Sequence, residues 1–180
     1  MRALFDVNVL VALLDADHHH HEHASRWLRE HGADGWASGP ITQNGCVRVM
    51  SQPSYPNPIP PHAVIWRLRE ATRHPKHEFW PDVVSLLDTD TIDEQRLHGP
   101  RQVTDLYLLA MAAKHEGTFV TFDHAVPLSA VRGARGAPLT LLRDLDLPYP
   151  APPAPAPPAP RVCRAWAGTA HRRRARHGAR

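Results

Sequence analysis

The sequence predicts an α/β fold in which a central, short parallel sheet is flanked by helices. Two observations support this prediction. Short apolar segments alternate along the chain with longer segments of helical periodicity, and glycine or proline marks many of the junctions. This alternation is typical of a parallel sheet whose two faces are covered by helices, which makes three layers.

The expected elements follow this alternation from the first residues onward. Strands are expected at residues 3–5, 35–38, 83–87, 118–122 and 138–142. Helices are expected at residues 7–14, 22–31, 42–50, 62–72 and 102–115.

Local signals justify the helices in order. The first begins directly after Asp6, and the second carries an apolar stripe and ends at Gly32. The third follows Pro40, with Thr42 as its expected N-cap. A proline-rich loop at residues 51–61 separates it from the fourth, and a glycine follows the long apolar fifth helix.

Composition divides the chain into a globular domain, residues 1–147, and a tail, residues 148–180. Six of the ten residues 151–160 are proline, which predicts an extended spacer. Residues 151–180 contain seven arginines and no acid, so the formal net charge of +3 leaves −4 on residues 1–150. The pI near 9.2 is therefore a property of the tail, which we expect to be disordered.

Composition also excludes several classes of protein. The two cysteines, Cys46 and Cys163, are too few for a disulfide framework or a CxxC metal site. Asp6 and Asn8 interrupt the apolar run at the N-terminus, which argues against a signal peptide or a membrane span. We therefore expect a cytoplasmic protein that does not bind membranes.

Three aspartates stand where an apolar strand stops or an apolar helix begins. Asp6 follows the first expected strand, Asp123 follows the strand at 118–122, and Asp105 lies near the start of the fifth helix. Ligands of parallel sheets bind outside the carboxyl ends of the strands, so one crevice can collect all three side chains. A half-buried carboxylate needs a compensating cation, and Mg²⁺ or Mn²⁺ prefers oxygen ligands.

Each aspartate also has an ordinary structural interpretation. Asp6 and Asp105 could cap helices, although Thr104 could cap the fifth helix equally well, and Asp123 could be a turn residue. The pattern of three acids at three such junctions favours a metal site for phosphate chemistry over three unrelated structural roles.

Three segments carry a resemblance to a known family: LFDVNVLVALL, PITQNGCVRVMS and QVTDLYLLAMAAKHEGTFVTFD. They resemble the PIN-domain ribonucleases, specifically the VapC-type toxins of toxin–antitoxin pairs, over roughly residues 1–147. The resemblance implies a PIN-like three-layer sandwich that cleaves RNA with one or two Mg²⁺ or Mn²⁺ ions held by four acids. Asp6 matches the first acid, Asp105 the third and Asp123 the fourth. It also implies a small antitoxin partner and a homodimer.

The second acid of the family is where the chain departs from the pattern. The family usually has a glutamate just inside the third helix, where this chain has Gln43, with Asn44 as an alternative alignment. A neutral amide can hydrogen-bond a metal-bound water or ligate weakly, but it cannot act as a carboxylate base. Gln43 could equally be a helix-start residue that bonds nearby backbone. We expect one cation rather than two, held mainly by Asp6 and Asp105.

These observations lead to two hypotheses of different classes. The first is a metal-dependent endoribonuclease, the toxin of a toxin–antitoxin pair, with Asp6, Gln43, Asp105 and Asp123 at its catalytic site. The alternative is a catalytically weakened module that binds RNA or antitoxin. A phosphatase of the aspartyl-phosphate kind would need a DxD motif after the first strand, and this chain has Asp-Val-Asn there.

Two further segments remain open. The run at residues 18–23 supplies five histidines and a glutamate, which could bind a transition metal or form a solvated loop. The arginine-rich tail could bind RNA non-specifically, or it could be a disordered extension without a role.

Overall fold

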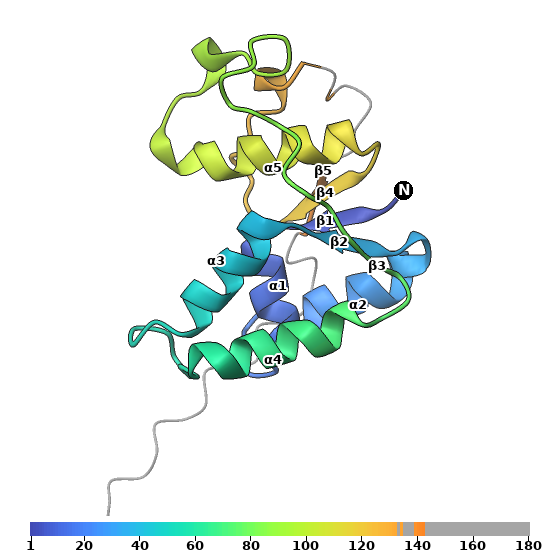
Figure 1. Cartoon of the computed structure of the whole chain (residues 1–180), viewed down its shortest axis with the longest axis vertical. Helices are drawn as coiled ribbons and strands as arrows, with labels where there is room; N and C mark the ends of the chain where they lie inside the picture. Colours follow the sequence, from blue (N-terminus) through green and yellow to red (C-terminus); the bar gives the residue numbers. More distant parts are fainter. Residues whose placement is uncertain (133, 135–138, 143–180) are drawn as a thin grey trace, which may run out of the picture. The chain divides into compact units, whose positions relative to one another are not determined.

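The computed structural model describes residues 1–132, 134 and 139–142 (Figure 1). The expected domain boundary at residue 147 and the expected disorder of residues 148–180 lie outside the described residues.

The described part of the chain forms a five-stranded parallel sheet in the order β3-β2-β1-β4-β5. The strands are β1 (Ala3–Phe5), β2 (Trp36–Ser38), β3 (His77–Phe79), β4 (Thr118–Thr121) and β5 (Leu139–Leu141). β1 is central, and its Leu4 is in register with Ala37 of β2 and Phe119 of β4. Because all strands are parallel, their carboxyl ends share one edge of the sheet.

Helices cover both faces of the sheet, which confirms the predicted three layers. They are α1 (Val7–Leu14), α2 (His21–His31), α3 (Pro40–Met50), α4 (Pro61–Thr72) and α5 (Val103–Lys114). Short 3₁₀ turns occur at Gly32–Asp34, Glu94–Arg96, Pro100–Gln102 and Leu128–Ala130. Figure 1 shows α5 on one face of the sheet and α1 to α4 on the other. None of the described helices is both long and apolar enough to cross a membrane.

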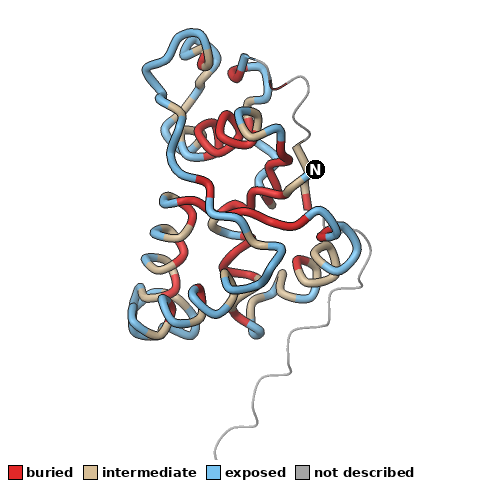
Figure 2. The backbone as a smooth tube through the Cα atoms, turned by 45° about the vertical axis from the view of Figure 1, so that its right-hand side comes forward, coloured by how far each residue is buried: buried red, intermediate tan, exposed pale blue. Residues whose placement is uncertain are grey.

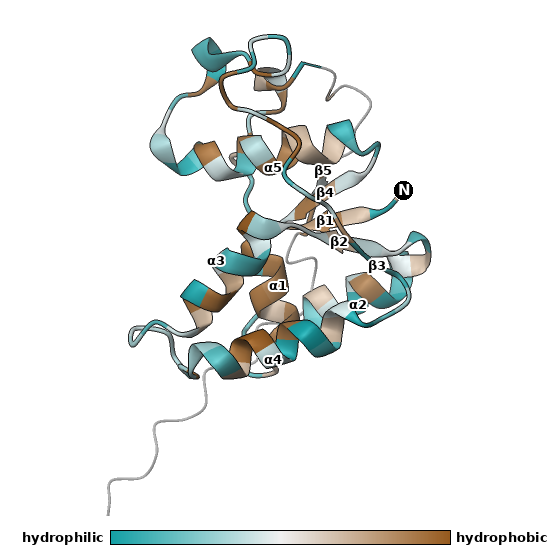
Figure 3. Ribbon diagram, in the orientation of Figure 1, coloured by the Kyte–Doolittle hydropathy of each residue, from teal (hydrophilic) through white to brown (hydrophobic). Residues whose placement is uncertain are grey.

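Successive side chains of β1 point to opposite faces of the sheet and so enter two separate hydrophobic cores. Leu4 faces the core under α5, whereas Ala3 and Phe5 face the core under α1, α3 and α4. The buried stretches gather at the sheet and along α5, where every residue from Asp105 to Ala112 is buried (Figure 2). α1 is apolar along most of its length, while α4 alternates between apolar and polar residues (Figure 3). The sheet edge that carries Asp6 is therefore held between two packed layers.

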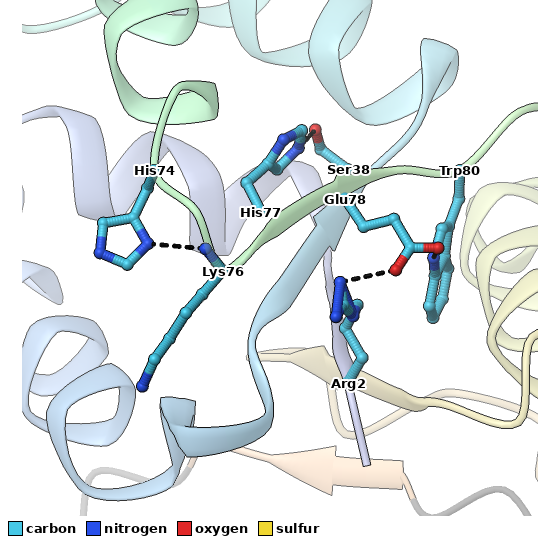
Figure 4. Close-up of polar contacts among 7 residues, drawn as sticks. All are labelled: Arg2, Ser38, His74, Lys76, His77, Glu78 and Trp80. Atoms are coloured by element: carbon cyan, nitrogen blue, oxygen red, sulfur yellow. Dashed lines mark hydrogen bonds and ion pairs between the residues drawn. The ribbon is translucent and has the colours of Figure 1, made fainter.

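Two details of the prediction are wrong. Residues 83–87 form no strand, and their apolar side chains are largely exposed, Leu87 to 91 %. The edge strand is β3, which is short and polar and is tied to the sheet by an ion pair from Arg2 Nη1 to Glu78 Oε2 at 2.6 Å (Figure 4). An edge strand needs little apolar surface, so hydrophobicity did not reveal it.

The start of the third helix also differs from its prediction. α3 begins at Pro40, with Gly39 at the N-cap, and Thr42 lies inside the first turn. The Thr42 hydroxyl accepts the Gly39 N–H at 3.0 Å and donates to the Gly39 carbonyl at 3.1 Å. The helix begins at Pro40 because proline is well suited to the first helical position. Thr42 then stabilises the helix start from within the first turn, through its two bonds to Gly39.

Candidate active site

The carboxyl edge of the sheet positions the three aspartates. Asp6 directly follows β1, and Asp123 stands two residues after β4, the strand beside β1. Asp105 is the third residue of α5, which packs on both of these strands. Three acids far apart in sequence thus converge on the ends of two neighbouring strands.

Asp6 is buried, with 4 % of its surface exposed, and both carboxylate oxygens accept hydrogen bonds. Oδ1 accepts the Val7 N–H at 2.6 Å, so Asp6 caps α1, and Oδ2 accepts the Thr121 hydroxyl at 2.9 Å. Burial nevertheless raises the pKa of Asp6, because loss of hydration outweighs these two bonds and the Asp123 carboxylate adds repulsion. The capping role therefore explains the position of Asp6 at the start of α1, but it does not explain why a carboxyl group with a raised pKa is buried there.

Asp105 is buried without a stabilising partner in the described part of the chain. Gln102 occupies the N-cap of α5, so Asp105 does not cap the helix. The pKa of Asp105 is raised to about 7, mainly by burial and additionally by repulsion from the carboxylates of Asp6 and Asp123. This interaction places all three carboxylates in one electrostatic cluster.

Asp123 is exposed and also serves as a turn residue. Its Oδ1 accepts the Ala125 N–H at 2.7 Å, and its own N–H donates to Thr121 Oγ1 at 3.1 Å. The Thr121 hydroxyl, which donates to Asp6, therefore joins the two aspartates. This threonine orients the Asp6 carboxylate and holds the backbone of Asp123.

Gln43 is bonded to Ser38 at the end of β2. Its Nε2 donates to Ser38 Oγ at 3.0 Å, and that hydroxyl also bonds His77 Nε2 at 2.9 Å. Figure 4 shows the Ser38–His77 pair at the β2–β3 edge. Among the described residues no hydrogen bond joins Gln43 to Asp6 or to the other two aspartates.

Sequence reasoning missed Ser38 and His77 because a lone serine at a strand end and a histidine in a polar segment carry no distinctive signal. Gln43 bonds Ser38, and the bond from Ser38 to His77 depends on the pairing of β2 with β3, in which Ser38 stands beside Phe79. Only the sheet order places them together.

The donor chemistry fits a hard divalent cation held by few protein ligands. Within the described residues, no three His, Cys, Asp or Glu side chains are grouped as ligands of one ion. Asp6 and Asp105 are close enough to repel each other, and Asp105 lacks a compensating cation among these residues. Mg²⁺ commonly uses one or two carboxylates and keeps several waters, so a two-carboxylate set suits it.

An open hollow of about 540 Å³ adjoins this cluster. It is lined by Asn8, Phe122, Asp123, His124 and Ala125. The hollow therefore begins at one of the three aspartates and lies over the start of α1.

Comparison with known proteins agrees with this geometry. Residues 3–132 match the family model of the PIN domain. The chain is 58% identical over 134 residues to Ribonuclease VapC44 of Mycobacterium tuberculosis, covering 74% of this chain and 94% of the relative. It is 42% identical over 134 residues to Ribonuclease VapC39 of the same species, covering 74% and 96%.

A solved structure shares the fold. It is the crystal structure of VapBC2 from Rickettsia felis bound to a DNA fragment from their promoter, with a TM-score of 0.50 and 14% identity, covering 78% of this chain and 98% of that one. At this identity the likeness concerns the fold alone. The family model and the two relatives decide the assignment: the chain belongs to the PIN-domain family and, within it, to the VapC ribonucleases.

Proposed function

We propose that the protein is a metal-dependent endoribonuclease whose active site is the cluster of Asp6, Asp105 and Asp123, and that it acts as the toxin of a toxin–antitoxin pair. One observation carries the site assignment. Asp105 is buried with a pKa near 7 beside two other carboxylates, which is an unfavourable arrangement unless it serves binding or catalysis. Its setting in a chain closely similar to Ribonuclease VapC44 supports ribonuclease chemistry.

In this proposal Asp6 and Asp105 hold one Mg²⁺ or Mn²⁺ ion. The bound ion would lower the pKa of a water and offset the negative charge of the scissile phosphodiester. The Val7 N–H and the Thr121 hydroxyl hold the Asp6 carboxylate in one orientation. Asp105, with its pKa near 7, must give up its proton to serve as a ligand, so binding releases a proton near neutral pH.

Asp123 and Gln43 take supporting roles. Asp123 is exposed at the mouth of the cluster, where its free oxygen can orient the attacking water and accept its proton. Gln43 substitutes for the second acid of the family without its charge. Because its amide is bonded to Ser38, we assign it the smallest share of catalysis.

A second observation, the neutral Gln43, favours one alternative. A fourth carboxylate is lacking at Gln43, so the chain could be a catalytically weakened module that binds RNA or an antitoxin. This alternative keeps the three-aspartate cluster but predicts no turnover.

Partners are proposed from the relatives and from the surface. Because the chain belongs to the VapC ribonucleases, we propose a small antitoxin as its partner and a cytoplasmic homodimer that binds this antitoxin. Ile65 and Trp66 on α4 are 43% and 57% exposed, which makes them candidates for such contacts, whereas Trp27 and Leu28 on α2 are half-buried and less suited.

Cleavage of a mixed RNA substrate tests the proposed function. The full chain should cleave with Mg²⁺ or Mn²⁺ and stop when a chelator is added. Asp105→Asn should lose cleavage, while Asp90→Asn, which changes an exposed aspartate outside the cluster, should retain it. Equal cleavage by wild type and Asp105→Asn would refute the site. Binding without cleavage by the wild type would favour the alternative.

A further inference from the structure

Phe122 lies between the two residues that organise the cluster. Thr121, which bonds Asp6, precedes it, and Asp123 follows it. The ring is half-buried: part of it packs against the core under α1, and part of it lines the 540 Å³ hollow beside Asp123. An aromatic ring therefore lies beside the Asp123 carboxylate at the wall of the hollow.

The histidine run stacks onto this ring. The ring centroids of His18 and His19 are 4.4 Å apart, those of His19 and His20 are 3.8 Å apart, and those of His20 and Phe122 are 4.4 Å apart at an interplanar angle of 20°. The ring centroids of His23 and Phe122 are 6.2 Å apart at an interplanar angle of 60°. His18, His19 and His20 thus form a compact group of rings directly before α2, and His20 is the member that stacks on Phe122, while His19 is exposed.

The surroundings of Phe122 suit a neutral flat group more than an anion. Burial, and then the neighbouring His19 and His20, lower the pKa of His18 from its ordinary value, which disfavours positive charge on that ring. Among the residues that the structure describes, the lining of the hollow contains the Asp123 carboxylate and no lysine or arginine. A phosphate group would be repelled there, whereas a neutral flat group would not.

The hollow also has the size and polarity for a base. Its volume falls within the roughly 300–1,000 Å³ that is usual for small-ligand sites. Asn8, exposed in the first turn of α1, offers an amide that can both donate and accept hydrogen bonds to a base edge. Single-stranded RNA is generally recognised by stacking its bases on aromatic side chains and bonding their edges.

We propose that Phe122, backed by His20, is a stacking platform for one unpaired nucleobase of the RNA substrate, next to the scissile phosphate. This inference rests on the proposed function and adds a substrate-positioning residue to it. The stacked base would fix the phosphodiester against the carboxylates and favour some sequences over others.

Binding to Asp105→Asn, which should not cleave, measures the platform without turnover. The probes are short, unstructured, fluorescently labelled RNA oligonucleotides that together contain every dinucleotide step. Adding Phe122→Leu keeps an apolar side chain for the core but removes the ring. We expect the dissociation constant to rise about 5- to 100-fold, the usual range for loss of one stacked base. Phe122→Tyr should bind like the parent, because the ring is retained.

The matched control is Phe79→Leu. Phe79 is 50% exposed on β3 and does not line the hollow, so the same chemical change there should leave RNA binding unaltered. Thermal unfolding of each variant checks that the fold is intact. Should Phe122→Leu fail to fold, Phe122→Trp supplies the readout instead: RNA binding should quench its added fluorescence.

Removing single bases from the RNA identifies the stacked position. One abasic substitution should weaken binding to the parent and have no further effect in Phe122→Leu. If every abasic substitution costs the same in both proteins, or if Phe122→Trp shows no quenching by bound RNA, the platform is refuted. Cleavage by the wild type with unaltered binding by Phe122→Leu would refute the platform alone; absence of any wild-type cleavage would refute the proposed function instead.

Discussion

Replacing Asp105 by asparagine should make the metal-free protein more stable above neutral pH. Asparagine has nearly the shape of a protonated aspartic acid but cannot ionise. In the wild type the side chain must carry a buried charge next to Asp6 and Asp123 once the pH exceeds about 7. The substitution removes that cost, so the variant gains stability while it loses function.

The magnitude follows from the pKa of Asp105. In the unfolded chain the carboxyl group ionises near 3.8, and in the folded protein near 7. Between these values the folded state holds a proton that the unfolded state has released, so the free energy of unfolding falls as the pH rises. The full difference corresponds to about 4 kcal/mol, and we expect about 2–4 kcal/mol above pH 7.

Urea unfolding in the presence of a chelator measures this difference at several pH values. The variant should match the wild type near pH 4 and exceed it increasingly up to pH 7, with a constant gap above. Asp90→Asn, an exposed control, should follow the wild type throughout. A variant that is less stable than the wild type at pH 8, or a gap that does not change with pH, would refute the reasoning.

Three further substitutions test other parts of the structure. Thr121→Val removes the hydroxyl that Asp6 accepts at 2.9 Å, so the pKa of Asp6 should rise further and RNA cleavage near pH 7 should fall about tenfold, with recovery at higher pH. Tyr55→Phe removes the donor to the buried Asp15 at 2.6 Å and should cost about 1.5–3 kcal/mol in urea unfolding without changing cleavage. Gly35→Ala should cost about 1–3 kcal/mol, because φ is 90° and the added Cβ would lie 2.4 Å from a backbone carbonyl oxygen.

Each of these predictions has a control within the chain. Thr121→Ser keeps the hydroxyl and should restore cleavage, so equal losses in both variants would contradict the hydrogen-bond argument. Gly99→Ala adds a Cβ with no atom within 4 Å and should change stability little. If Gly35→Ala is as stable as Gly99→Ala, the steric argument is wrong. A loss of cleavage in Tyr55→Phe would show that its bond to Asp15 matters for catalysis.

The layered fold could be predicted because its signals are local. Apolar strands, helix periodicity and glycine or proline junctions placed β1, β4 and α5 close to their observed bounds. The edge of the sheet could not be predicted in the same way. The run at residues 83–87 is as apolar as a strand but is exposed, while the actual edge strand, His77–Phe79, is held by pairing with β2 and by Arg2.

The candidate site was likewise predictable where its signals are local and not where they depend on strand pairing. An acid at a strand end or helix start is visible in the sequence, and burial with repulsion between carboxylates raises the pKa values of Asp6 and Asp105, while their role in one catalytic site stays a prediction. The contacts of Gln43 were not visible, because they depend on two strands meeting side by side. The link from the histidine run to Phe122 depends likewise on a contact between distant segments.

Titration of the full chain with Mn²⁺ above pH 7, followed by calorimetry, tests the central claim most directly. We predict one ion per chain, bound with release of protons, and a loss of this binding in both Asp6→Asn and Asp105→Asn but not in Asp90→Asn. Undiminished binding in Asp105→Asn would contradict the claim that these carboxylates form the metal site.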